Sequence, residues 1–142
     1  RARDFDLRAM LGGAYSIQAR MDEIGDKGNK ATDTEKRQYT VLEVAREMVK
    51  RGYYFENVDI MQSEASDFIL TRDKQGLRLP FVALDGLGYK AAKSIVDARD
   101  DKLFSSREDV KKRTLVSNSL YNKLDALEAF GDLPDTPQMS LF

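Results

Sequence analysis

The stretch "LDGLGYK" constrains the fold of this chain more than any other, because two glycines flank a single leucine just before a helical pattern. Gly86 and Gly88 permit a turn too tight for residues that carry a Cβ atom. Apolar residues on both sides of the turn can hold two helices across so short a connection. They are Leu84, Leu87, Ala91, Ala92, Ile95 and Val96. The stretch therefore predicts two helices joined by a tight hairpin.

The composition limits the chemistry that the chain can perform. With 142 residues, 42% of them hydrophobic, the chain suits one domain of ordinary size or two small lobes. Cysteine and histidine are absent, which excludes disulfides, thiol nucleophiles, imidazole bases and the usual zinc ligand sets. The 23 basic and 24 acidic residues nearly cancel, so any nucleic-acid site must be local.

The sequence has neither of the common membrane signals. No apolar run approaches the roughly 20 residues that span a bilayer, and no charged and apolar leader precedes the fold. We therefore expect a cytoplasmic protein with no membrane partner. The chain begins with Arg1 and not with Met, which suggests a piece of a longer protein.

Hydrophobic periodicity predicts a mainly α-helical chain with a small β element. A short helix should begin after Asp6 as its N-cap, and a third helix should begin with a capping box from Thr32 to Glu35. Gly52 should end that helix. The second helix should carry its apolar residues at Ala14, Ile17, Met21 and Ile24, and the third at Tyr39, Leu42, Ala45, Met48 and Val49.

Apolar and polar residues alternate around the turn-like "DKQG", which predicts strands. We expect a hairpin of Phe68–Thr71 with Leu77–Leu79, and a third strand at Val58–Ile60. Helices should return at Ala91–Arg99, Arg107–Lys112 and Leu120–Glu128. The chain then divides into a helical segment (1–52), a small β element (53–80), a pair of helical hairpins (81–131) and an extended tail (132–142).

The glycine hairpin can bind an anion, because backbone N–H groups and a helix N-terminus converge there without an obstructing side chain. Lys90 and Lys93 lie in the first helical turn, where they oppose the helix dipole, and an outside anion would remove that cost. A phosphate fits this pattern. A glycine-rich turn with no ligand fits the spacing equally well.

The charge distribution favours the phosphate. Between Gly86 and Arg113 there are eight basic and five acidic residues, a net charge of +3 in a chain whose total is −1. The stretch "KKRTLVSNSLYNKL" repeats the helical hairpin, with Ser117, Asn118 and Ser119 where the first hairpin has glycines. Their short side chains can reach phosphate oxygens, or they can merely cap the last helix.

Two further segments have alternative interpretations. Asp4 and Asp6 have the alternate spacing of a magnesium site, but the helical pattern after them favours capping by Asp6. The ending "QMSLF" places apolar side chains on a segment that Pro134 and Pro137 keep extended. It can dock in an apolar pocket of a partner or fold back onto the core of the protein itself.

The order of several stretches closely resembles the C-terminal region of the Gram-positive, PolC-type DNA polymerase III α subunit. The resemblance covers essentially the whole chain. It is carried by "RARDFDLRAM", "VLEVAREMVKRGYYFENVDIMQSEASDFIL", "LDGLGYKAAKSIVDARDDKLFSSREDVKKRTLVSNSLYNKLDALEAF" and the terminal "QMSLF". It implies the end of the fingers region, then a tandem helix-hairpin-helix domain that binds duplex DNA, then a peptide that docks on the sliding clamp.

Site residues follow from this resemblance position by position. The implied DNA-binding residues are Gly86, Leu87, Gly88, Tyr89, Lys90, Lys93, Lys111, Lys112, Arg113, Ser117, Asn118 and Ser119. The implied clamp-binding residues are Gln138, Met139, Leu141 and Phe142. Asp85 stands where such hairpins commonly carry proline, and it puts a negative charge near the expected phosphate. The polymerase's metal-binding aspartates lie upstream in the family, so this segment should be inactive alone and should need no cofactor.

The resemblance implies a role in DNA replication through processivity, in the cytoplasm at the nucleoid. Phosphate contacts would hold the primer-template duplex, and the tail would tether the polymerase to its clamp. A different class of function is an interaction module whose hairpins are purely structural and which is recruited only through its tail.

Overall fold

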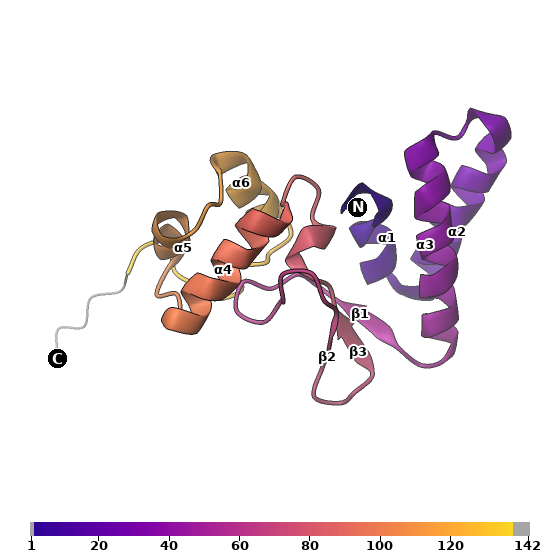
Figure 1. Cartoon of the computed structure of the whole chain (residues 1–142). Coiled ribbons are helices and arrows are strands. Elements are labelled where there is room, and N and C mark those ends of the chain that lie inside the picture. Colours follow the sequence, from indigo (N-terminus) through magenta and orange to yellow (C-terminus); the bar gives the residue numbers. More distant parts are fainter. Residues whose placement is uncertain (1, 138–142) are drawn as a thin grey trace.

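The computed structural model describes residues 2–137, and Figure 1 shows their arrangement. Three helices near the N-terminus form a group at one end, three further helices form a group at the other, and a small sheet lies between and below them. The chain is mostly helical, as the sequence predicts. Gln138, Met139, Leu141 and Phe142, the predicted clamp peptide, lie outside the described residues.

The N-terminal group begins with a 3₁₀ turn, η1 (Ala2–Asp4), followed by α1 (Leu7–Leu11) and α2 (Gly13–Lys27). A second 3₁₀ turn, η2 (Gly28–Lys30), leads into α3 (Asp33–Lys50). The predicted capping box is confirmed, because the Thr32 hydroxyl accepts from the Glu35 N–H while the Glu35 carboxylate accepts from the Thr32 N–H. Gly52 follows α3 with a φ of +93°, which confirms the predicted stop.

The sheet has three short strands in the order β1-β3-β2, with bounds Tyr54–Glu56 (β1), Ile69–Leu70 (β2) and Gly76–Arg78 (β3). β2 and β3 form the predicted antiparallel hairpin, and β1 pairs with β3 in parallel. The third strand was predicted at Val58–Ile60, which is wrong. Val58 and Ile60 are buried in the core, and the Ile60 N–H donates to the carbonyl of Ala129 and not to a neighbouring strand.

The C-terminal group begins with η3 (Phe81–Ala83), and its helices are α4 (Tyr89–Asp101), α5 (Arg107–Arg113) and α6 (Asn118–Ala126). The first hairpin thus joins a 3₁₀ turn to a helix, whereas the second joins two α-helices. Each of these four elements buries apolar residues in a core that also includes residues of the N-terminal helices. Fully buried residues of this group include Phe81, Leu87, Ile95, Val110 and Leu124.

Candidate nucleic-acid interface

The first hairpin comprises residues 84–88 and has the tight geometry that its glycines predict. Gly86 adopts a φ of +89°, a conformation that residues with a Cβ atom rarely tolerate. Leu87 is 1% exposed, and its N–H donates to the carbonyl of Leu84 at 3.0 Å. The buried leucine anchors the turn, and both glycines remain exposed at the surface.

Helix α4 begins at this hairpin without a side-chain cap. Its N-cap is Gly88, in an extended conformation, which has no side chain to accept from the first-turn amides. By contrast, Asp6, Thr32, Ser106 and Ser117 cap α1, α3, α5 and α6 with side-chain oxygens. The N-terminus of α4 therefore presents backbone donors and the positive end of a helix dipole at the surface.

The second hairpin comprises residues 113–117, and its last residue caps the helix that follows. Ser117 is the N-cap of α6, and its hydroxyl accepts from the Leu120 N–H. Aligning the two N-caps places Ser117 opposite Gly88 and the buried Val116 opposite Leu87. Asn118 and Ser119 therefore lie in the first turn of α6, and of the three residues only Ser117 occupies a glycine position.

Each hairpin contacts the helix that follows the other. The N–H of Leu115, in the second hairpin, donates to Ser94 Oγ of α4 at 3.0 Å. In the first hairpin, a Cβ atom on Gly86 would lie 3.5 Å from Leu120 Cδ2 of α6. These reciprocal contacts hold the two turns near one another. Ser94, which the second turn contacts, lies about six residues or ~9 Å along α4 from Gly88 at the first turn.

The predicted phosphate-binding lysines are exposed on this group of helices. Lys93 pairs with Asp97 at 2.9 Å and Lys112 with Glu108 at 2.8 Å, each one turn away on its own helix. Hydrogen bonding to these carboxylates raises the pKa of both lysines, so both are charged at neutral pH. Such exposed pairs are weak and can be exchanged for a phosphate. Lys90 is also exposed.

Lys111, another lysine that the sequence predicts to bind DNA, contacts the aromatic ring of Tyr121. The Nζ atom of Lys111 lies 4.2 Å from the centre of that ring, a cation–π contact that connects α5 with α6. The contact leaves Lys111 exposed, so its charge contributes to the same surface.

The arginines of the basic stretch, in contrast, hold the fold together. The terminal nitrogens of Arg113 donate to the carbonyls of Ala98 and Lys102 and to the Asp109 carboxylate. Arg99 is 8% exposed and donates to two carbonyls of the loop before the sheet hairpin. Arg107 pairs with Asp125. The net charge of +3 between Gly86 and Arg113 thus overstates the positive charge available to a ligand. Most of the exposed positive charge in this stretch comes from lysines.

Two cations that sequence reasoning missed lie beside the first hairpin. Lys123 Nζ donates to the carbonyl of Asp85 at 3.0 Å, and Arg3 Nε donates to the Asp85 carboxylate at 3.4 Å. The predicted negative charge of Asp85 is therefore accompanied by two positive charges. Neither partner is near Asp85 in sequence, so no local pattern pointed to either of them.

The N-terminal aspartates have structural partners. Asp6 caps α1 by accepting from the Ala9 N–H, as predicted, and its second oxygen accepts from Arg20. Asp4 accepts from Arg37 Nε, which lowers the pKa of Asp4. Within residues 2–137, no group of three or more carboxylates is placed to hold a metal ion. Over the same residues, no helix combines the length and apolarity that a bilayer crossing requires.

Comparisons with known proteins agree with this geometry. The family model of the helix-hairpin-helix motif matches residues 52–138, more than half of the chain. Over 142 residues, the chain is 49% identical to the DNA polymerase III PolC-type of Bacillus cereus, 46% to that of Pediococcus pentosaceus and 43% to that of Listeria monocytogenes. Each match covers 100% of this chain and 10% of the relative, so the chain spans about a tenth of these curated relatives.

Proposed function

This chain belongs to the helix-hairpin-helix motif family, and on that premise we propose that it is a non-catalytic, duplex-binding part of a bacterial replicative DNA polymerase. The observation that carries the proposal is the start of α4 at Gly88, where the first-turn amides have no side-chain cap. A phosphate oxygen is the ligand that such a helix start prefers, because the amides donate to it and the dipole favours its charge.

The exposed lysines support the same ligand. Lys90 and Lys93 lie in the first turns of α4, where their charge is unfavourable next to the helix dipole unless an anion is bound. Lys111 and Lys112 on α5 add positive charge beside the second hairpin. Lysine binds phosphate as a mobile point charge, whereas the arginines of this region are fixed by carbonyls.

Recognition of this kind is independent of base sequence, since backbone amides and lysines reach phosphate oxygens and not base edges. Such contacts would hold the product duplex while the polymerase advances. We propose that the terminal Gln138, Met139, Leu141 and Phe142 dock on the sliding clamp. That second contact would raise the effective concentration of the polymerase on the same DNA. The composition of the segment and the two prolines before it support this role.

The duplex proposal is tested by titrating the chain against a short fluorescent duplex at several salt concentrations. We expect affinity to fall as salt rises, with little difference between duplexes of different sequence. Replacing Lys90, Lys93, Lys111 and Lys112 together with Ala should lower affinity at least ~100-fold at low salt and flatten the salt dependence.

A variant with the same charge change is the control for this experiment. Lys30, Lys36, Lys50 and Lys74 are exposed and lie in the N-terminal helices and the sheet hairpin. Replacing these four with Ala should change affinity only about threefold. Equal losses in the two variants, or binding that does not respond to salt, would contradict the proposal.

The tail proposal is tested separately, by pull-down of the sliding clamp with the intact chain and with one that lacks residues 138–142. Loss of capture on truncation, with duplex affinity unchanged, is the expected result. If the chain captures the clamp but never binds duplex, the rival function as an interaction module is correct. We also expect no nucleotide incorporation by the chain alone.

A further inference from the structure

Asp85 lies at the tip of the first hairpin and is bracketed by residues from two distant parts of the chain. Lys123 of α6 donates from Nζ to its backbone carbonyl at 3.0 Å, across 38 residues of sequence. Arg3 of η1 donates from Nε to its carboxylate at 3.4 Å, across 82 residues. Two elements, α6 and η1, therefore converge on the turn that precedes α4.

Lys123 is close to the hairpin backbone itself. A Cβ atom on Gly86 would lie 3.3 Å from Lys123 Nζ, so the ammonium group covers the position where any other residue would place a side chain. A lysine ammonium has three N–H donors, and the Asp85 carbonyl uses one of them. Lys123 is exposed, so the remaining donors are available to an anion at the hairpin.

Arg3 offsets the charge of the Asp85 carboxylate. The two side chains are 73% and 58% exposed, so their pair contributes little to folding stability. Its effect is on the local field, because an unpaired carboxylate beside a phosphate site would repel the phosphate. The position of Arg3 is fixed through its backbone, since Gln38 Nε2 of α3 donates to the Arg3 carbonyl at 2.8 Å.

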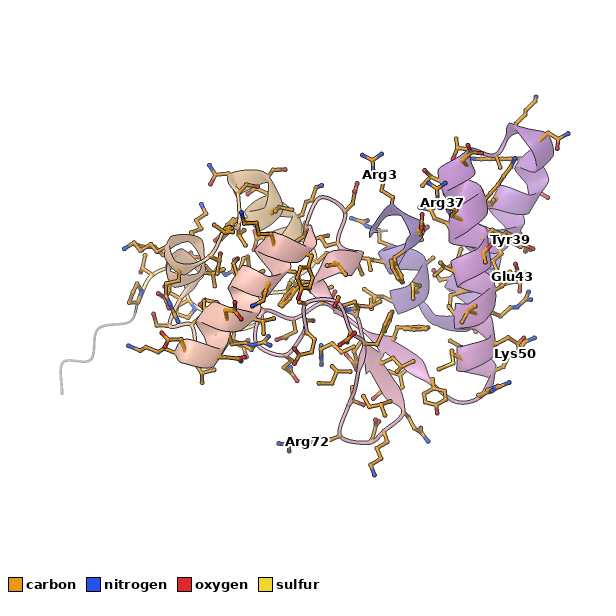
Figure 2. The ribbon with its side chains drawn as sticks, in the orientation of Figure 1. Arg3, Arg37, Tyr39, Glu43, Lys50 and Arg72 are labelled. Atoms are coloured by element: carbon orange, nitrogen blue, oxygen red, sulfur yellow. The ribbon has the colours of Figure 1, made fainter. Side chains whose placement is uncertain are left out.

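Neighbouring contacts hold η1 against α3. Arg37 Nε donates to the Asp4 carboxylate at 2.8 Å, and Figure 2 shows Arg3 and Arg37 near one another in the upper part of the view. The N-terminal segment thereby places the positive charge of Arg3 beside the first hairpin. This segment lies outside residues 52–138, which the helix-hairpin-helix model matches.

We infer that Lys123 and Arg3 complete the phosphate site of the first hairpin: Lys123 binds the phosphate directly, and Arg3 is a positioning residue that neutralises Asp85. This inference rests on the proposed duplex binding. It assigns to the site two residues from outside the glycine turn and explains how the hairpin accommodates an acidic residue at its tip.

Substitution of Lys123 tests the direct contact in the full chain. Lys123→Met keeps the aliphatic part of the side chain and should weaken duplex binding about tenfold while lowering the salt slope by about one. Lys123→Arg should restore most of the affinity. Lys50→Met is the matched control, because Lys50 is also exposed and lies at the far end of α3 in Figure 2.

A double-mutant cycle tests Arg3. Arg3→Ala should weaken binding several-fold, whereas Arg3→Ala with Asp85→Asn should return to the affinity of Asp85→Asn alone, since the carboxylate to be neutralised is gone. Arg72→Ala is the control, because Arg72 lies at the tip of the sheet hairpin and points away from the molecule in Figure 2. If the double variant stays as weak as Arg3→Ala, the neutralising role is wrong.

The outcomes separate this inference from the function on which it rests. Absence of salt-dependent duplex binding by the unsubstituted chain would overturn the proposed function itself. Normal duplex binding that Lys123→Met and Lys50→Met affect equally would overturn only the assignment of Lys123. Thermal denaturation of each variant, followed by circular dichroism, shows whether a loss of affinity reflects loss of folding.

Discussion

The two hairpins have nearly the same backbone at the start of their second helix but different chemistry. Gly88 adopts φ and ψ of −72° and 172°, and Ser117 adopts −75° and 167°. The Ser117 hydroxyl caps its own helix, whereas Gly88 leaves the first-turn amides of α4 to outside partners. Two N-caps with nearly the same backbone geometry therefore differ in whether the first-turn amides of the helix have a side-chain acceptor.

The turn tips differ as well. Gly86 requires positive φ, whereas the corresponding Leu115 carries an exposed side chain and is held by a hydrogen bond to Ser94. The first hairpin is thus a tight turn with open space around Gly88, whereas the tip of the second carries a side chain and a hydrogen bond to α4. We expect the first to bind phosphate more strongly than the second.

Among single substitutions within the two hairpins, the largest effect should come from Gly86→Val. A valine would be strained at a φ of +89°, at a cost of about 1–3 kcal/mol, and its Cβ atom would lie 3.3 Å from Lys123 Nζ. We expect duplex affinity to fall at least ~10-fold, because an altered turn misplaces the amides that follow it. Fluorescence anisotropy with a labelled duplex measures this loss.

Leu115→Val is the matched control at the tip of the second hairpin. It should leave duplex affinity within about twofold, because this tip carries a side chain already. If both variants lose affinity equally, the difference between the hairpins has no functional meaning.

A smaller effect is expected from Ser94→Ala, which removes the acceptor for the Leu115 N–H. The second hairpin should loosen, with a loss of about 1 kcal/mol in the free energy of unfolding. Hydrogen exchange at the Leu115 amide should accelerate, while exchange in the first hairpin stays unchanged. Ser66→Ala, at an exposed position, is the control for both measurements.

Exchanging the caps tests the comparison directly. Gly88→Ser should give α4 the cap of α6, because a Cβ atom there meets no atom within 4 Å and the backbone is already extended. We expect a gain of a few tenths of a kcal/mol in folding stability and a several-fold loss of duplex affinity, since the new hydroxyl competes for the same amides.

The reverse substitution, Ser117→Gly, should lose the same small stability and should not lose duplex affinity. A rise in affinity would show that the second hairpin can be converted into a phosphate site. Higher affinity of Gly88→Ser than of the unsubstituted chain would contradict the role assigned to the α4 amides.

Local patterns predicted the elements of this fold well, because caps and glycines act over a few residues. Asp6, Thr32 and Gly52 all perform the predicted roles. The third strand was misplaced because β1 pairs with β3 in parallel, more than 20 residues away, and no local pattern encodes that register.

Long-range electrostatics were also hidden from the sequence. A count of charges treats arginine and lysine alike, yet the side chains of Arg99 and Arg113 donate hydrogen bonds to backbone carbonyls. The difference has a physical basis, because the planar guanidinium can donate to several fixed acceptors at once. The sequence did not link Arg3 and Lys123 to the first hairpin, because their partner, Asp85, is distant in sequence. The pairing of β1 with β3 was missed for the same reason.

Helix α3 begins with a capping box, which differs from the glycine N-cap of α4 and the serine N-cap of α6 because it includes a carboxylate. Its contribution to folding stability should therefore depend on pH. Hydrogen bonding to Lys27, and then to the Thr32 backbone, lowers the pKa of Glu35 from its ordinary 4.5 to about 2. Because the folded-state pKa is depressed, the carboxylate stabilises the fold above pH 4.5, and this contribution is lost as the pH falls towards 2.

Glu35→Gln should keep an oxygen for the Thr32 N–H but remove this titration. Between pH 4.5 and 2, the melting temperature of the variant should therefore fall less than that of the unsubstituted chain. Glu43→Gln, on the same helix and exposed, should leave the slope unchanged. Equal slopes in all three proteins would show that the carboxylate does not act through its charge. Because the α4 start has no carboxylate cap, Gly88→Ser should not alter this pH dependence.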